Sequence, residues 1–251
     1  MTDWTRGEGG TCEAQLFLAE PADGSGPLAC VAKLPDNPRG VRALVNEWVA
    51  AGLLDLLGLT HPASFALDVA PGTIPAGARY LSGVPVGPGL AFASTYLASS
   101  TPLGCPPLTH LVNPGTVAGV VLFDVWTYNA DVRQLRLVPA GPGQSRGRAY
   151  AVDQDGCLAG HRWTAAALAQ AADPFLTVAQ DQLLTAVPHW PRHLSRALGH
   201  LTRLDRATVA AMVATLPPQW SVTPGEQAAV VDFLVRRIPS AAALFRARLG
   251  P

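Results

Sequence analysis

The sequence predicts an α+β fold with two lobes: a small N-terminal sheet with one helix, and a larger, mainly helical C-terminal lobe. Two short apolar runs, at 13–19 and 28–34, are separated by Pro, Asp and Gly residues, which is typical of a β-hairpin. Toward the C-terminus, helical patterns separated by prolines predominate. We place the lobes at 1–90 and 91–251, because the pattern weakens into Pro and Gly between 61 and 107.

One amphipathic helix is predicted in the N-terminal lobe, at 40–57. Its large apolar residues recur three or four positions apart, while small Ala residues and Glu47 lie on roughly the opposite side. Gly58 follows the last apolar residue, where glycine commonly ends a helix. A further strand is predicted at 65–69, and the phrase 87–92 lies near the lobe boundary with no predicted element of its own.

A buried helix at 115–128 is predicted to follow the lobe boundary, since its residues are almost wholly apolar. Asn113 can cap this helix, and Pro114 suits its first position because no hydrogen bond is lost there. Two short strands then form a second hairpin, at 135–138 and 149–152. The second of these strands leads directly into an acidic turn.

The rest of the chain is predicted to be helical. Thr223 and Glu226 form a capping box at the start of one helix, and Pro239 separates the last two helices. The predicted helices are 163–172, 178–186, 191–201, 206–215, 224–237 and 240–248.

The composition excludes several classes of function. Eighteen basic and 18 acidic residues give no net charge, and there is no Lys/Arg run, so we expect neither direct nucleic-acid binding nor membrane binding. No apolar stretch approaches the ~18 residues of a membrane span, and no secretory signal precedes the first elements, so a cytoplasmic protein is expected. The four cysteines lack C-x-x-C spacing, which argues against a zinc site or a disulfide framework.

One basic residue differs from all the others. Of the 18 basic residues, Lys33 is the single lysine and the rest are arginines. An ammonium differs from a guanidinium in shape, hydration and reach, so a lysine retained in an arginine-rich chain indicates a chemical role, with chance as the alternative.

Five features of the sequence are the parts that phosphoryl transfer from ATP needs, and their order along the chain strengthens this interpretation. A Gly-rich turn precedes the first strand, a lysine ends the second strand, and a glutamate lies on the helix that follows. One aspartate follows the buried helix, and a second aspartate follows the second hairpin. Taken singly, each has an ordinary structural explanation: a mobile terminus, a surface residue, a solvated helix residue or a turn. These residues are Gly9, Gly10, Thr11, Lys33, Glu47, Asp131 and Asp153.

Two other arrangements carry less weight. The stretch 153–156 has the acidic residues of a calcium loop, but the required later Glu is missing. His189 and His193 have the i, i+4 spacing of a metal site, but Pro191 intervenes and no nearby Glu accompanies them.

The sequence resembles the HipA-like kinases, in particular the compact relatives that lack the extra N-terminal subdomain of the HipA toxin kinase. The resemblance spans nearly the whole chain and implies a two-lobed protein-kinase-like fold with Mg²⁺-dependent transfer from ATP to a protein Ser/Thr hydroxyl. The phrases that carry it are 44–50, 88–96, 123–134, 152–154 and 217–220.

The resemblance also implies roles for the residues above. Lys33 would contact the phosphates of ATP, Glu47 would hold Lys33, and Gly9-Gly10-Thr11 would lie over the phosphates. Asp131 would be the catalytic base, and Asp153 would be the magnesium ligand. The implied partners are therefore ATP, Mg²⁺ and a protein substrate that the sequence does not identify.

One position departs from the HipA pattern. HipA has a metal-binding Asn five residues after its catalytic Asp, whereas this chain has Arg136 there; Gln134 is nearer and could supply a neutral oxygen ligand. A catalytically weak, nucleotide-binding pseudokinase that regulates a partner is therefore the alternative to an active kinase. An interaction protein that binds no nucleotide is a third interpretation, against which the single lysine argues.

Overall fold

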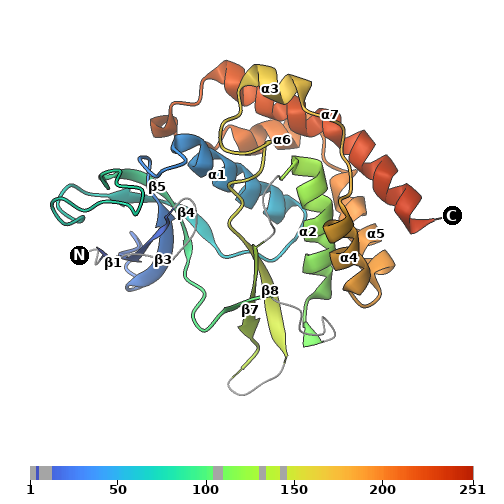
Figure 1. The fold of residues 1–251 in the computed structure, drawn as a ribbon, viewed down its shortest axis with the longest axis horizontal. Helices are drawn as coiled ribbons and strands as arrows, with labels where there is room; N and C mark the ends of the chain where they lie inside the picture. Colours follow the sequence, from blue (N-terminus) through green and yellow to red (C-terminus); the bar gives the residue numbers. More distant parts are fainter. Residues whose placement is uncertain (1–3, 6–12, 104–109, 130–133, 142–145, 251) are drawn as a thin grey trace.

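The computed structural model describes residues 4–5, 13–103, 110–129, 134–141 and 146–250. Figure 1 shows a β-sheet on one side of the molecule and a group of helices on the other, with the helix α1 (Val41–Leu56) between them. A hairpin of two strands lies where the two parts meet. The predicted α+β arrangement is therefore confirmed.

A five-stranded antiparallel sheet forms the N-terminal lobe, in the order β1-β2-β3-β5-β4. The strand β2 alternates buried and half-buried residues, as expected when one face of a strand lies on a core. The central strand β3 places Lys33 opposite Phe92 of β5. The strands are β1 (Trp4–Thr5), β2 (Gln15–Ala19), β3 (Leu28–Lys33), β4 (Ser64–Val69) and β5 (Gly89–Thr95).

The strand β5 is an element that the sequence did not predict. Its residues GLAFAST include few β-branched side chains, so its local preference for a strand is weak. It is nevertheless paired on both edges, with β3 and β4, and this pairing stabilises the strand. The expected lobe boundary between residues 90 and 91 falls inside this strand.

The helix α1 is buried on more than one side. Leu44 and Leu53 of its apolar face are buried, and so are Ala50 and Glu47 on the side with small residues. The small side chains let the helix approach its neighbours closely, which brings Glu47 into the interior. The predicted helix end is confirmed, because Gly58 adopts a left-handed φ of 66°.

The helix α2 (Pro114–Thr127) is buried along almost its whole length, as predicted. The expected capping by Asn113 is wrong: this residue occupies the N-cap position, but its side chain does not bond to the helix backbone. Its Nδ2 donates to the carbonyl of Ala149, and its Oδ1 accepts from the Ala149 N–H. The side chain therefore joins the start of α2 to a strand instead of capping the helix.

The second hairpin consists of β7 (Gln134–Pro139) and β8 (Gly147–Val152), as predicted within one or two residues. A short strand, β6 (Thr101–Pro102), adds to its edge and completes a three-stranded sheet. The register places Gln134 opposite Val152, so the start of β7 lies beside the end of β8.

The helical lobe surrounds α2. The prediction that 224–237 and 240–248 are separate helices is wrong, because α7 continues through Pro239. Pro239 is exposed, while residues on both sides of it, including Ile238 and Phe245, are buried. Packing of these neighbours outweighs the hydrogen bond that proline removes. The helices are α3 (Ala165–Gln170), α4 (Val178–Ala186), α5 (Trp190–Leu201), α6 (Arg206–Val213), a 3₁₀ turn (Pro218–Trp220) and α7 (Pro224–Leu249).

The capping box at the start of α7 is confirmed, since the side chain of Thr223 accepts from the Glu226 N–H and Glu226 bonds back to the Thr223 backbone. Within the described ranges, no helix has the length and apolar character needed to span a membrane.

Candidate active site

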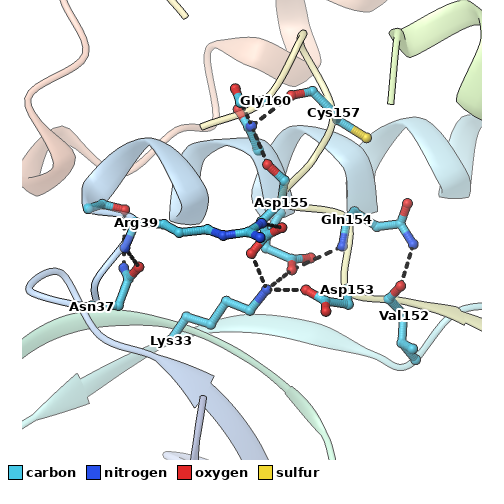
Figure 2. Close-up of polar contacts among 12 residues, drawn as sticks. Lys33, Asn37, Arg39, Val152, Asp153, Gln154, Asp155, Cys157 and Gly160 are labelled. Atoms are coloured by element: carbon cyan, nitrogen blue, oxygen red, sulfur yellow. Dashed lines mark hydrogen bonds and ion pairs between the residues drawn. The ribbon is translucent and has the colours of Figure 1, made fainter. Parts of the chain in front are cut away.

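Lys33 lies at the end of β3, and its ammonium contacts three carboxylates. Its Nζ is 2.5 Å from Glu47 Oε1, 2.5 Å from Asp153 Oδ1 and 3.0 Å from Asp155 Oδ2. Figure 2 shows these contacts converging on the end of the lysine side chain. Only 7% of Lys33 is exposed, and a charge this deeply buried is strongly destabilising without such partners.

Glu47 reaches this cluster from the middle of α1. Its Oε1 contacts the ammonium of Lys33 and also accepts a hydrogen bond from the Gln154 N–H at 3.0 Å. Burial raises the pKa of the Glu47 carboxyl, and the charge of Lys33 opposes this rise, whereas Asp153 and Asp155 increase it. The ionised state of Glu47 therefore depends on Lys33.

Asp153 and Asp155 lie in the turn directly after β8. The backbone of Asp153 is left-handed, with φ 57°, a conformation that is strained for a residue with a side chain and that is frequent at functional sites. The Asp153 side chain keeps 27% of its surface exposed, against 2% for Asp155. Of the two carboxylates, Asp153 is therefore the more accessible to a ligand.

Arg39 supplies a second cation to the same cluster. Its Nη1 lies 2.6 Å from Asp155 Oδ1, so that Asp155 joins two cations (Figure 2). Asn37 fixes the segment that carries Arg39, because its side chain accepts from the Arg39 N–H and donates to the Leu34 carbonyl. The position of Arg39 is thus set by a local turn between β3 and α1.

Asn46 attaches the turn after β8 to α1. Its Nδ2 lies 2.7 Å from the carbonyls of Asp155 and Cys157 and 3.1 Å from that of Gly160. Its Oδ1 accepts from the indole N–H of Trp163 at 2.8 Å. Since Asn46 directly precedes Glu47, one turn of α1 positions both the acidic turn and the partner of Lys33.

The cluster has the donor set of a hard cation. One ligand oxygen from each of Glu47, Asp153 and Asp155 lies within 4.8 Å of the others. These three carboxylates face the two cations Lys33 and Arg39, which leaves one net negative charge among the five side chains. Carboxylate oxygens are the ligands that Mg²⁺ prefers, so these residues fit a magnesium ion.

The sequence-predicted site residues have different outcomes. The structure brings together the side chains of Lys33, Glu47 and Asp153. Gln134 begins β7 opposite Val152, so its backbone lies beside the residue that precedes Asp153. The remaining predicted residues, Gly9, Gly10, Thr11 and Asp131, lie outside the described residues.

Asp155, Arg39 and Asn46 were not predicted as members of the site. Asp155 was interpreted with its neighbours as a turn or a fragment of a calcium loop, although it lies only two residues after Asp153. Asn46 adjoins Glu47 in the sequence, which is the one signal that could have identified it. For Arg39 the sequence offers no such signal, because the chain contains 16 other arginines and nothing near Arg39 distinguishes it from them.

The end of α2, from which the chain enters the segment that contains Asp131, is held by Arg237 of α7. The Arg237 Nε donates to the Trp126 carbonyl at 2.7 Å, and Nη2 donates to the Val125 carbonyl at 2.9 Å. These carbonyls belong to the last turn of α2, which has no intrahelical donors for them. Arg237 therefore fixes the direction in which the chain leaves α2.

Arg136, which departs from the HipA pattern, bonds away from the Lys33 cluster. Its Nε donates to Ser100 Oγ at 3.0 Å, and its Nη2 donates to the Ser100 carbonyl at 2.8 Å. Its guanidinium is thus engaged at the β6 edge of the three-stranded sheet.

Comparisons with known proteins bear on the fold. No protein family and no curated protein sequence matches the chain. In structure, the chain is similar to the Helicobacter pylori proinflammatory kinase CtkA, with a TM-score of 0.60 and 10% sequence identity, over 98% of this chain and 93% of that chain. A similarity at this identity concerns the fold alone. The predicted two-lobed protein-kinase-like fold is therefore confirmed.

Proposed function

We propose that this chain is a phosphotransferase that uses Mg²⁺-ATP to phosphorylate a protein Ser or Thr hydroxyl, as expected of a HipA-like kinase. The observation that supports this most is the meeting of Lys33 from β3, Glu47 from α1 and Asp153 after β8 in one buried cluster on a kinase-like fold. Phosphoryl transfer depends mainly on positioning and on neutralising charge, and this cluster is suited to both.

In this proposal, Lys33 binds the phosphates of ATP and Glu47 holds its ammonium through their 2.5 Å contact. A compact ammonium on a flexible stem suits phosphate oxygens as a point charge. The stretch Gly9-Gly10-Thr11 would lie over the phosphates, because glycine allows the backbone N–H groups to approach them.

Asp153 would hold Mg²⁺, since it is the more exposed of the two aspartates, with Asp155 and Gln134 as further oxygen donors. A bound magnesium ion would supply positive charge against the charge that develops on the phosphoryl group. Asp131 would accept the proton of the substrate hydroxyl. Arg237 would act as a positioning residue for that loop, because it fixes the end of α2.

A pseudokinase that binds nucleotide without transferring phosphate is the second candidate. The observation that favours it is Arg136, at the position where HipA has a metal-binding Asn. Nucleotide binding and phosphate transfer must therefore be measured separately.

Thermal unfolding with and without Mg²⁺-ATP tests the nucleotide site. A ligand at about 100 times its Kd stabilises a protein by roughly 2.7 kcal/mol, which corresponds to a Tm rise of roughly 5–10 °C for a chain of this size. We expect this rise in the wild type and its loss in Lys33→Ala. Arg148→Ala, which removes an exposed cation from β8, is the matched control and should keep the rise.

Transfer of labelled γ-phosphate, to the chain itself or to a mixture of Ser/Thr peptides, distinguishes the two candidates. An active kinase loses transfer in Asp131→Asn and in Asp153→Asn but keeps it in Asp68→Asn, an exposed aspartate of β4. A Mg²⁺-dependent Tm rise without transfer in the wild type supports the pseudokinase. No rise at millimolar Mg²⁺-ATP contradicts both candidates.

A further inference from the structure

The helix α5 (Trp190–Leu201) has two contrasting sides. Leu194, Ala197, Leu198 and Leu201 are buried, and the helix packs against α2 and α7. Its other side is exposed, at the edge of the helical lobe (Figure 1). The exposed side is therefore available to a partner.

Basic residues form a row along this exposed side, which we call the α5 basic stripe. Successive members recur at steps that keep them on one helical face, with the first at the N-cap and the last just beyond the helix end. The three arginines are exposed, and two of the three histidines are half-buried. The stripe consists of His189, Arg192, His193, Arg196, His200 and Arg203.

Acidic residues are absent from the stripe itself. No acidic residue occurs between 188 and 204, and none of its arginines forms an ion pair with another described residue. Of the nearest acids in the sequence, Asp181 of α4 pairs with Arg248, and Asp205 accepts a hydrogen bond from the backbone of α6. A chain with no net charge therefore carries a locally positive surface.

The environment of the histidines reflects this positive surface. Burial lowers the pKa of His193, and Arg192, His189 and Arg196 lower it further. Burial likewise lowers the pKa of His200, and Arg203 and Arg196 add to the effect. The charged groups that lower these two pKa values are positive, which agrees with a local excess of positive charge.

The stripe also passes the N-terminus of α2. The Nδ1 atom of His193 lies 3.1 Å from the position that a Cβ atom on Gly115 would occupy. Gly115 is the second residue of α2, a helix of 14 residues whose dipole places partial positive charge at this end. The helix dipole therefore adds to the attraction of an anion.

We propose that the α5 basic stripe binds the phosphodiester backbone of a nucleic acid. Protein interfaces have an apolar centre, yet no large exposed apolar side chain of the described residues lies on α5. Nucleic-acid interfaces are polar and positively charged, as this stripe is. Between Arg192 and His200 the stripe runs about 12 Å along the helix. Each strand of a duplex carries one phosphate per about 3.4 Å of the duplex axis, so this length corresponds to three to four phosphates of one strand.

This proposal goes beyond the proposed kinase activity and does not depend on it, because no stripe residue belongs to the Lys33 cluster. It differs from the expectation, drawn from the net charge, that the chain does not bind nucleic acid directly. The net charge of the whole chain does not reveal the stripe, because the acidic residues that balance it lie in other segments, including 153–155 and 20–23.

Fluorescence anisotropy with a labelled duplex of roughly 16 base pairs tests the proposal, with DNA and RNA duplexes of one sequence as separate probes. The three arginines of the stripe are expected to contact three phosphates. The Kd should then rise about 40-fold between 50 and 200 mM salt, from a slope of about −0.9 per phosphate. Binding of either duplex in this manner supports the proposal.

The variants decide whether the stripe is responsible. Arg192→Gln/Arg196→Gln/Arg203→Gln should weaken binding at least about tenfold at low salt and nearly abolish the salt dependence. Arg79→Gln/Arg148→Gln/Arg162→Gln removes as many exposed charges from segments outside the stripe and should bind as the wild type does. Circular dichroism checks that each variant is folded, and the single charge reversal Arg196→Glu provides a second test on the same helix.

Three results overturn the proposal. The first is no binding of either duplex at 50 mM salt. The second is an equal loss in the two triple variants, which would indicate a non-specific effect of net charge. The third is tighter binding of a poly-glutamate peptide than of either duplex, which would assign the stripe to an acidic protein.

Discussion

Lys33 and Arg237 are both buried cations, with 7% and 2% of their surfaces exposed, but their partners differ in kind. Lys33 is surrounded by three carboxylates, which carry full negative charges. Arg237 donates to the carbonyls of Val125, Trp126 and Ala172, which are neutral dipoles. The first arrangement contains more negative charge than its cation neutralises. In the second, the cation is bonded to carbonyls and forms no ion pair with a carboxylate of the described residues.

This difference separates a site that can exchange partners from one that holds the fold together. We expect the carboxylates around Lys33 to accept a further cation and its ammonium to accept an anion. Arg237 has its planar fork directed at fixed backbone atoms, and burial lowers the pKa of its guanidinium only to about 10, so it stays charged at neutral pH. We therefore expect its removal to affect stability first.

Arg237→Met should have the largest effect on stability, a loss of roughly 4 kcal/mol in the free energy of unfolding, because it leaves buried carbonyls of α2 without donors. Urea unfolding at pH 7 measures this loss. Arg236→Met is a matched control: Arg236 also donates to two carbonyls, those of Leu168 and Ala169, but it is exposed. The control should cost less than about 1 kcal/mol, and equal losses in the two variants would contradict the distinction.

Lys33→Met should destabilise the protein by roughly 3 kcal/mol at pH 8, and less at lower pH. Without the ammonium, the pKa of the buried Glu47 carboxyl rises further, since burial and the neighbouring aspartates already raise it. A carboxyl whose pKa is higher in the folded than in the unfolded state adds stability at low pH and loses it as the pH rises. The deficit against the wild type should therefore shrink from pH 8 to pH 5.

Unfolding curves at several pH values between 5 and 8 measure this change. Arg148→Met, which removes an exposed cation from β8, should show no such trend. A Lys33→Met deficit that is the same at every pH would mean that the carboxylates do not depend on Lys33 for their charge.

The ion pair of Arg42 and Glu226 should give the smallest effect on stability. Its exposure is intermediate between that of the buried cations and that of the fully exposed ones. Arg42 of α1 pairs with Glu226 of α7 and stacks 4.1 Å above the Trp163 ring, but both charged side chains are 24% exposed. A double-mutant cycle with Arg42→Met and Glu226→Gln should give a coupling energy below about 1 kcal/mol, because solvent screens the pair. A coupling energy as large as that of a buried ion pair would show that exposure to solvent does not decide how much these cations contribute to stability.

Local sequence features predicted much of this fold but not its long-range contacts. The strands β2 and β3, the helix α1 and the hairpin of β7 and β8 follow from apolar spacing and turn residues. The strand β5 and the continuity of α7 at Pro239 depend on neighbours far away in the chain. Propensity rules describe only the local conformational preference of a residue. Contacts with distant neighbours override this preference in the strand β5 and at Pro239.

The site shows the same division. The order of Lys33, Glu47 and Asp153 along the chain predicted that they lie together, and their contacts are present in the structure. Arg39 and Asn46 act through the conformation of two turns, which a sequence pattern does not specify. The functional roles of all these residues stay a prediction.

The Lys33 cluster also has a consequence for synthesis of the chain. Lys33 is separated from Asp153 and Asp155 by 120 and 122 residues. At about 5–20 residues per second, a ribosome makes Lys33 roughly 6–24 s before Asp155. During that interval the ammonium has Glu47 as its one available partner from the cluster, and burying it with so few partners is unfavourable. The N-terminal sheet is therefore complete in sequence well before the acidic turn that contacts Lys33 has been synthesised.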